Sequence, residues 1–244
     1  MARYKLTLCY DGSEYYGFQR QPNLPTVQSA LEEALAKRFQ EEITVQASGR
    51  TDAGVHAIAQ VAHFDTDKEF DTATFGYSLN TLLPKDIAIT SCVKVGDNFH
   101  ARFDAKSKTY LYKICLSKIH SPLKRRYGHI CFYDLDVSKM QDACKYFVGE
   151  HDFRAFMLAD EEKQNTVRQI YSLQVEQNGE DLNIWISGNG FLHNMVRIIA
   201  GTLIDVGRGR IALEDIPEII NSKKHVGTGK TLEPCGLYLY KVEY

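Results

Sequence analysis

The sequence predicts an α+β fold made of two halves, each with the element order β-α-β-β-α-β. Three observations support it: apolar residues that alternate along short stretches, helical stretches that follow capping residues, and the recurrence of one element order in both halves. The halves, residues 1–104 and 105–244, are expected to share a mixed, mainly antiparallel central sheet with pseudo-two-fold symmetry. A cleft between the halves is the expected ligand site.

The first half opens with a stretch in which every second residue is apolar, from Tyr4 to Tyr10, as in a half-buried strand. Thr26 and Asp71 are residues that can cap helices through their side-chain oxygens. A polar, glycine-bearing segment, 48–56, separates two strand-like stretches. The expected elements, in chain order, are strand 4–10, helix 27–39, strands 43–47 and 57–64, a helix from Asp71 to Leu82, and strand 87–95.

The second half is expected to repeat this order. Asp136 can cap its first helix, and Gly207 can end its second. The expected elements are strand 109–116, helix 137–147, strands 167–175 and 182–186, helix 192–207, a short helix over 213–220, and a final strand 237–242.

Composition excludes several classes of protein. With 44% hydrophobic and 25% charged residues among 244, the chain can bury a sizeable core. No stretch approaches the roughly 18 apolar residues that span a bilayer, and the start, Met1-Ala2-Arg3-Tyr4-Lys5, lacks the apolar stretch of a secretory signal. The six cysteines lie far apart, without a C-x-x-C pair or the histidine spacing of a metal site. We expect a cytoplasmic protein with no metal and no membrane contact.

The net charge of −2 argues against nonspecific coating of nucleic acid, which requires many lysines and arginines. A nucleic-acid site would therefore depend on local clusters of basic residues. The ordinary explanation for each short cluster is a solvated surface, and we take that view of most of them singly. The clusters are Lys106/Lys108, Lys124/Arg125/Arg126, Arg197, Arg208/Arg210 and Lys223/Lys224.

The segment from Ser48 to His56 has the highest density of polar residues that could carry chemistry. Loops held between strands are frequent places for catalytic groups, and Gly49 and Gly54 allow tight turns or close approach of a ligand. Arg50 and Asp52 place opposite charges two residues apart. A tight turn with a weak surface ion pair explains the same spacing equally well.

Two further positions are candidates. Tyr110 and Tyr112 share one face of a predicted strand and could form a surface on which a base stacks, although strand aromatics are more often core residues. Arg197 lies in a strongly apolar helix, so its guanidinium must reach water or pair with a carboxylate. We expect such a partner acid.

Several segments in the right order resemble the TruA family of tRNA pseudouridine synthases. The main one is Gly49-Arg50-Thr51-Asp52-Ala53-Gly54-Val55-His56-Ala57, followed by Gln60-Val61 and His63-Phe64. The others are Tyr10-Asp11-Gly12, Tyr16-Gly17-Phe18-Gln19, Thr26-Val27-Gln28, Leu79-Asn80, Leu83-Pro84, Phe99-His100-Ala101-Arg102, Tyr110-Leu111-Tyr112, His151-Asp152-Phe153, Phe191-Leu192, Met195-Val196-Arg197 and Gly236-Leu237. The resemblance departs from the family pattern at Leu232-Glu233-Pro234-Cys235, where a small residue commonly stands beside the proline.

The resemblance implies a pseudouridine synthase fold of two ferredoxin-like halves and the isomerisation of uridine to pseudouridine. The implied targets are positions 38, 39 and 40 in the anticodon stem-loop of tRNA, modified by a homodimer without a cofactor. Asp52 would be the nucleophile, attacking either C1′ of the sugar or C6 of the base. Arg197 would be the cation beside it.

By the same resemblance, Arg50 would hold the target nucleotide out of the helix, and Tyr110 would stack on its uracil and help to remove the C5 proton. His56 and Arg102 are further candidate substrate-binding residues. The main alternative is a non-catalytic, tandem RRM-like RNA-binding protein. It would carry the aromatic consensus of such modules, which this sequence lacks.

Overall fold

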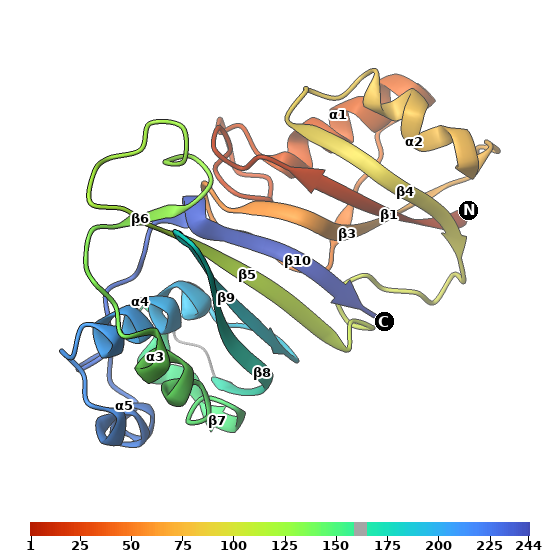
Figure 1. Ribbon diagram of the computed structural model, residues 1–244. Coiled ribbons are helices and arrows are strands. Elements are labelled where there is room, and N and C mark those ends of the chain that lie inside the picture. The colour runs from red at the N-terminus through yellow and green to blue at the C-terminus, as the bar shows by residue number, and fades with distance from the viewer. Residues whose placement is uncertain (159–164) are drawn as a thin grey trace. The chain divides into compact units, whose positions relative to one another are not determined.

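The computed structural model describes residues 1–158 and 165–244. These residues form two compact units, one of residues 1–106 with 238–244 and the other of residues 107–237 (Figure 1). We call them unit 1 and unit 2. They differ from the predicted halves in one element, because the last strand of the chain groups with unit 1. The described helices have at most 13 residues, and none could span a membrane.

Unit 1 confirms the predicted element order β-α-β-β-α-β. Strand β1 pairs antiparallel with β3 on one side and β4 on the other, β2 pairs antiparallel with β3, and β10 pairs parallel with β3. The sheet is therefore mixed and mainly antiparallel. Its elements are β1 (Ala2–Tyr10), α1 (Val27–Phe39), β2 (Gln46–Ala47), β3 (His56–Thr66), α2 (Thr72–Asn80), β4 (Ile87–Val95) and β10 (Leu237–Glu243).

An aromatic cluster joins both helices of unit 1 to the same side of the sheet. Phe39 of α1 lies 5.6 Å from Phe75 of α2 and 6.0 Å from Phe64 of β3, measured between ring centroids. Tyr4 of β1 stacks on Phe64 at 5.6 Å, and Phe70 packs on Phe75 at 4.2 Å. Tyr4 and Phe39 are apolar positions that the alternation in β1 and the periodicity of α1 predict.

Two predicted boundaries in unit 1 were wrong for identifiable reasons. The strand expected over 43–47 is reduced to Gln46–Ala47, because the backbone N–H and C=O of Val45 bond to Glu32 and Gln28 side chains of α1. The second helix ends at Asn80, whose side chain bonds the backbone N–H and C=O of Ile89. Leu82 consequently lies beyond the helix and is exposed.

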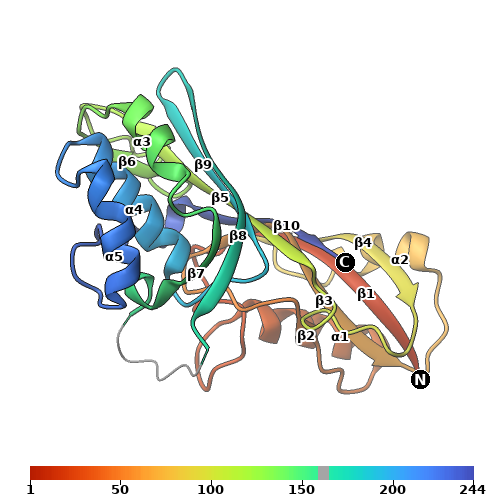
Figure 2. The same cartoon turned by 90° about the horizontal axis from the view of Figure 1, so that it is seen from below.

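Unit 2 contains an antiparallel sheet in the order β5-β9-β8-β7, with β6 parallel to β5. Helices α3, α4 and α5 lie on one side of these strands (Figure 2). The short strands β6 and β7 are additions to the predicted order. The elements are β5 (Ser107–Leu116), β6 (His129–Cys131), α3 (Val137–Cys144), β7 (Gly149–Asp152), β8 (Val167–Asn178), β9 (Asp181–Gly188), α4 (Met195–Gly207) and α5 (Ile216–Ser222).

The helix expected from residue 192 begins at Met195, because Asn194 adopts a left-handed backbone conformation with φ 59°. Gly201 in α4 approaches the 229–230 segment so closely that a Cβ would lie 2.0 Å from the Lys230 carbonyl oxygen.

The predicted fold class, α+β with mixed, mainly antiparallel strands, is confirmed by both units.

Removing the α1 cap should destabilise the protein. Thr26 is fully buried and its hydroxyl oxygen accepts the Ser29 N–H at 3.2 Å in a capping box. We expect Thr26→Ala to lower the free energy of unfolding by about 1 kcal/mol in chemical denaturation. Thr44→Ala, at an exposed position outside helices and strands, is the matched control and should change it by less than about 0.5 kcal/mol. Equal effects of the two substitutions would contradict the cap.

Candidate active site

The polar segment 48–56 connects β2 to β3 in unit 1, and its beginning is fastened to β3. The Ser48 N–H donates to the Val61 carbonyl at 2.7 Å, and the Ser48 hydroxyl donates to the Gln60 side chain at 2.7 Å. The Gln60 amide group donates in turn to the Gly49 carbonyl at 3.0 Å. Ser48 and Gln60 are both fully buried, so these bonds are shielded from water.

The residue before Asp52 is held through both its side chain and its backbone. The Thr51 hydroxyl bonds to the Tyr10 hydroxyl at 2.8 Å, and the Thr51 carbonyl accepts the Phe18 N–H at 3.1 Å. Burial raises the pKa of Tyr10 to about 12, so its hydroxyl stays neutral at physiological pH. The Asp52 carbonyl accepts the Val55 N–H at 3.1 Å, and Asp52 itself is half-buried. The candidate carboxylate therefore stands on a fixed backbone.

Residues 11–20, which we call the backing loop, touch the Asp52 segment backbone to backbone. The Gly54 N–H donates to the Tyr15 carbonyl at 3.2 Å. A Cβ on Gly12 would lie 2.0 Å from the Val55 carbonyl oxygen, and one on Gly17 would lie 2.5 Å from the Thr51 carbonyl oxygen. Gly17 also has φ +87°, which favours glycine. Gly12 therefore needs glycine for space, and Gly17 needs it for both space and conformation.

His56 closes the other end of the segment and is only 1% exposed. Its Nδ1 accepts the Gly12 N–H at 3.1 Å and lies 3.2 Å from an Asp11 carboxylate oxygen. Its ring stacks on Tyr238 of β10, with centroids 4.8 Å apart. The imidazole thus joins the backing loop, β3 and β10, while its contact with substrate stays a prediction.

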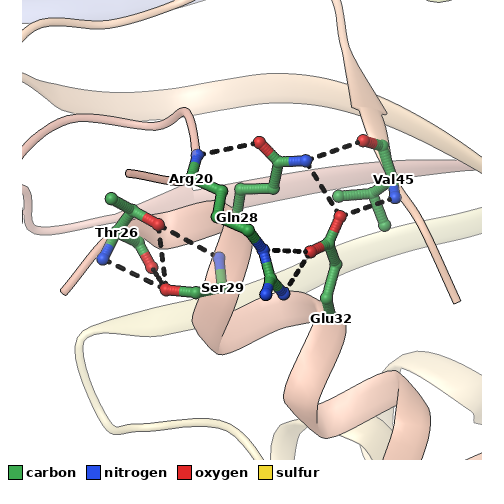
Figure 3. A network of polar contacts seen from close by, with 6 residues as sticks. All are labelled: Arg20, Thr26, Gln28, Ser29, Glu32 and Val45. Carbon is green, nitrogen blue, oxygen red and sulfur yellow. Dashed lines mark hydrogen bonds and ion pairs between the residues drawn. The ribbon is translucent and has the colours of Figure 1, made fainter. Parts of the chain in front are cut away.

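One buried carboxylate fixes the backing loop to α1 (Figure 3). Glu32 is 7% exposed and accepts bonds from the Arg20 guanidinium at 2.9 and 2.5 Å, from the Gln28 amide at 2.9 Å and from the Val45 N–H at 3.0 Å. Gln28 also accepts the Arg20 N–H at 3.0 Å. The predictions missed Glu32, although its position four residues after Gln28 places both side chains on one helix face.

The two candidate arginines of unit 1 are exposed. Arg50 lies in the Asp52 segment, and Arg102 lies in a turn over residues 99–104. That turn is held by His63 of β3, whose Nδ1 accepts the Ala101 N–H at 3.1 Å. Burial lowers the pKa of His63 to about 4, which keeps the ring neutral and able to accept this bond. Each arginine can therefore reach solvent from an anchored backbone.

The remaining candidates lie in unit 2, on β5 and on α4, which pack together. Tyr110 is 8% exposed, and its ring meets Phe191 edge to face at 5.1 Å. Tyr112 is completely buried and its hydroxyl donates to the Glu233 carbonyl at 2.8 Å. Of the two tyrosines, Tyr112 is therefore a core residue, and Tyr110 remains the candidate for stacking.

Arg197 lies in the first turn of α4 and is half-buried. Its Nε donates to the Leu232 carbonyl at 2.6 Å and its Nη1 to the Asn194 side-chain oxygen at 2.5 Å. These two partners are neutral. The carboxylate partner expected from the sequence stays a prediction.

Several of the basic clusters are partly neutralised by nearby acids. Lys124 lies 3.3 Å from Glu180 and 3.5 Å from Asp181, Lys223 lies 3.3 Å from Asp152, and Arg208 lies 3.2 Å from Asp205. Within residues 1–158 and 165–244, no group of three or more His, Cys, Asp or Glu side chains is arranged to hold a metal ion.

Because the backing loop lies so close to Thr51, a side chain at Gly17 should destabilise the protein. Gly17→Ala should lower the free energy of unfolding by more than about 2 kcal/mol, because the methyl group meets the Thr51 carbonyl and the backbone is left-handed. Chemical denaturation measures this change. Gly96→Ala is the matched control, since a Cβ there would have no atom within 4 Å. Similar stabilities of the two variants would rule out the close approach.

The chain is similar to known proteins along most of its length. A family model described as tRNA pseudouridine synthase matches residues 8–104 and 143–244, and so includes the Asp52 segment, the backing loop and α4. A crystal structure of the archaeal box H/ACA sRNP Nop10–Cbf5 complex is similar at TM-score 0.34 and 15% identity, with 95% of this chain and 46% of that chain covered.

Curated relatives match along the full chain. This chain is similar to "tRNA pseudouridine synthase A" of Caldicellulosiruptor bescii, with 47% identity over 98% of both chains. The matched stretch includes Tyr110 and Arg197. The enzymes of the same name from Bacillus licheniformis and Listeria monocytogenes are each 44% identical, over 99% and 100% of both chains. The chain belongs to the TruA family of tRNA pseudouridine synthases.

Proposed function

We propose that this tRNA pseudouridine synthase modifies uridines 38, 39 and 40 of the tRNA anticodon stem-loop, with Asp52 as its nucleophile. The observation that carries the proposal is the single carboxylate on the anchored segment 48–56, inside the stretch that the family model matches. In the reaction the C1′–N1 bond breaks, the uracil rotates, a C1′–C5 bond forms, and the C5 proton is replaced by one at N1. The product is an isomer of the substrate, so no co-reactant is consumed.

A nucleophilic carboxylate must be ionised and must be held within reach of the reacting carbon. The bonds of Thr51, Gly54 and Val55 restrict the backbone on both sides of Asp52, which supports this role. Attack on the sugar C1′ and attack on the base C6 both fit such a carboxylate. In either case the fixed backbone positions Asp52, and the Asp52 carboxylate forms a temporary covalent bond to the substrate.

The other residues act on the target nucleotide or on Asp52. The exposed Arg50, two residues before Asp52, enters the RNA helix and holds the uridine outside its stack, because the reacting atoms are inaccessible in a paired helix. Tyr110 stacks on the extruded uracil and helps to take the C5 proton. Arg197 stabilises the ionised Asp52. His56 and Arg102 contribute to substrate binding, and no metal or organic cofactor takes part.

The protein works in the cytoplasm as a homodimer in which one tRNA contacts both subunits. The small net charge and the acid-paired lysines of unit 2 support this arrangement. A dimer brings together basic residues that are too few on one chain, and attraction of RNA depends on where charges lie more than on their sum.

Asp52→Ala should abolish turnover without abolishing tRNA binding. The assay is tritium release from tRNA labelled at uracil C5, with a chelator present, in tRNAs that carry a single uridine at 38, 39 or 40. We expect no release by the variant and a tRNA Kd within roughly tenfold of the wild type, because phosphate contacts supply most of the affinity.

Asp97→Ala, at an exposed acid of unit 1, is the matched control and should release tritium normally. Appreciable turnover by Asp52→Ala would remove Asp52 from the nucleophile role. Release from tRNAs that lack all three uridines would contradict the proposed positions. Intact binding with no release by the wild type would favour an RNA-binding protein without this activity.

Tyr110→Phe separates the two roles proposed for this tyrosine. The ring remains, so stacking and tRNA affinity should persist, whereas loss of the hydroxyl should slow C5 proton removal by about 100-fold or more. With deuterium at C5, the variant should show a larger kinetic isotope effect than the wild type. An unchanged rate would exclude Tyr110 from proton transfer.

A further inference from the structure

Asn194 is an unusual helix N-cap. It precedes α4 with φ 59° and ψ 1°, and only 7% of it is exposed. Asparagine at an N-cap ordinarily accepts a backbone N–H of the first turn, but the Asn194 side chain makes no such bond. Its oxygen instead accepts Nη1 of Arg197 at 2.5 Å. The side chain that should cap the helix is used to hold the guanidinium.

The chain segment before β10 provides the second hold on Arg197. The guanidinium Nε donates to the Leu232 carbonyl at 2.6 Å, and the Leu232 N–H donates back to the Arg197 carbonyl at 3.5 Å. The segment is itself fixed, because the next carbonyl, that of Glu233, accepts the buried Tyr112 hydroxyl and the Glu233 carboxylate pairs with the His129 ring. Because the two acceptors bond to different nitrogens of the guanidinium, they fix the orientation of its plane as well as its position.

We propose that Asn194 is a positioning residue that presents the Arg197 guanidinium in the orientation that the reaction requires. The inference rests on the proposed function, in which Arg197 stabilises the nucleophile. A fork of N–H donors is directional, so rotation of its plane moves the donors away from their target. A misplacement of about 1 Å can cost on the order of 100-fold in rate. Asn194 therefore acts on catalysis through Arg197 and without touching the RNA.

The left-handed backbone at Asn194 makes a clean experiment possible. Asn194→Gly removes the acceptor and keeps a residue that adopts positive φ without strain, whereas Asn194→Asp keeps both an acceptor and a tolerated backbone. Asn23→Gly is the matched control, because Asn23 has φ 60° and is exposed. Each variant is compared with the wild type in kcat and KM for tritium release from tRNA, and in Tm.

We expect Asn194→Gly to lower kcat about tenfold with KM and Tm nearly unchanged, Asn194→Asp to restore kcat to within about threefold, and Asn23→Gly to match the wild type. NMR of the arginine side chains gives a readout that is independent of turnover. The Nη protons of Arg197 should be resolved by slow rotation in the wild type and averaged in Asn194→Gly.

The inference and the proposed role of Arg197 can fail separately. Full activity of Arg197→Met would end the proposed role of the guanidinium, whatever Asn194 does. If Arg197→Met is impaired while Asn194→Gly keeps the kcat of the wild type, the positioning role of Asn194 is wrong. A lower Tm with unchanged kcat, or a loss of kcat that Asn194→Asp does not restore, would leave Asn194 as a structural residue only.

Discussion

The arrangement of unit 1 depends on a contact between two backbones that leaves no room for a side chain. Gly12 and Gly17 bring the backing loop against the carbonyls of Val55 and Thr51. A side chain at either position would separate the two loops. It would break two hydrogen bonds that fix the Asp52 segment: the one from the Phe18 N–H to the Thr51 carbonyl and the one from the Gly54 N–H to the Tyr15 carbonyl. The buried Glu32 then transmits the rigidity of α1 to the backing loop through Arg20. The segment of the candidate nucleophile is thus connected to a packed helix through hydrogen bonds and close backbone contacts.

The two units hold their candidate charged groups by different means. In unit 1 the backbone around Asp52 is fixed by hydrogen bonds to neighbouring loops and strands. In unit 2 the guanidinium of Arg197 itself donates hydrogen bonds, to the Asn194 side-chain oxygen and to the Leu232 carbonyl. An aspartate side chain is short, so a fixed backbone is enough to fix the position of its carboxylate. An arginine has several rotatable bonds and loses about 2 kcal/mol of rotamer entropy, so it needs partners near its end.

Local patterns in the sequence predicted most elements but not the contacts that shape the site. The alternation in β1 and the caps Thr26 and Asp71 correctly predicted their strand and helices, because local periodicity and capping carry that information. In β8 the register shifts between Ile170 and Ser172, so Val167 and Tyr171 are exposed although they are apolar. Glu32 and Asn194 looked like ordinary helix residues, since their partners Arg20, Val45 and Arg197 become apparent only when side chains are placed. The role of Asp52 as nucleophile stays a prediction, which rests on the resemblance of its segment to a known family.

The parallel pairing of β10 with β3 has a consequence for how the protein is made. Tyr238 and Leu239 complete the sheet beside His56 and Ala57, and the Tyr238 ring covers the imidazole that closes the Asp52 segment. The ribosome synthesises Tyr238 and Leu239 more than 170 residues after the segment beside which they lie. Unit 2 can fold while unit 1 waits for its final strand. A chain cut off before Tyr238 would therefore leave the His56 ring without this stacking partner, at the end of the segment that carries the candidate nucleophile.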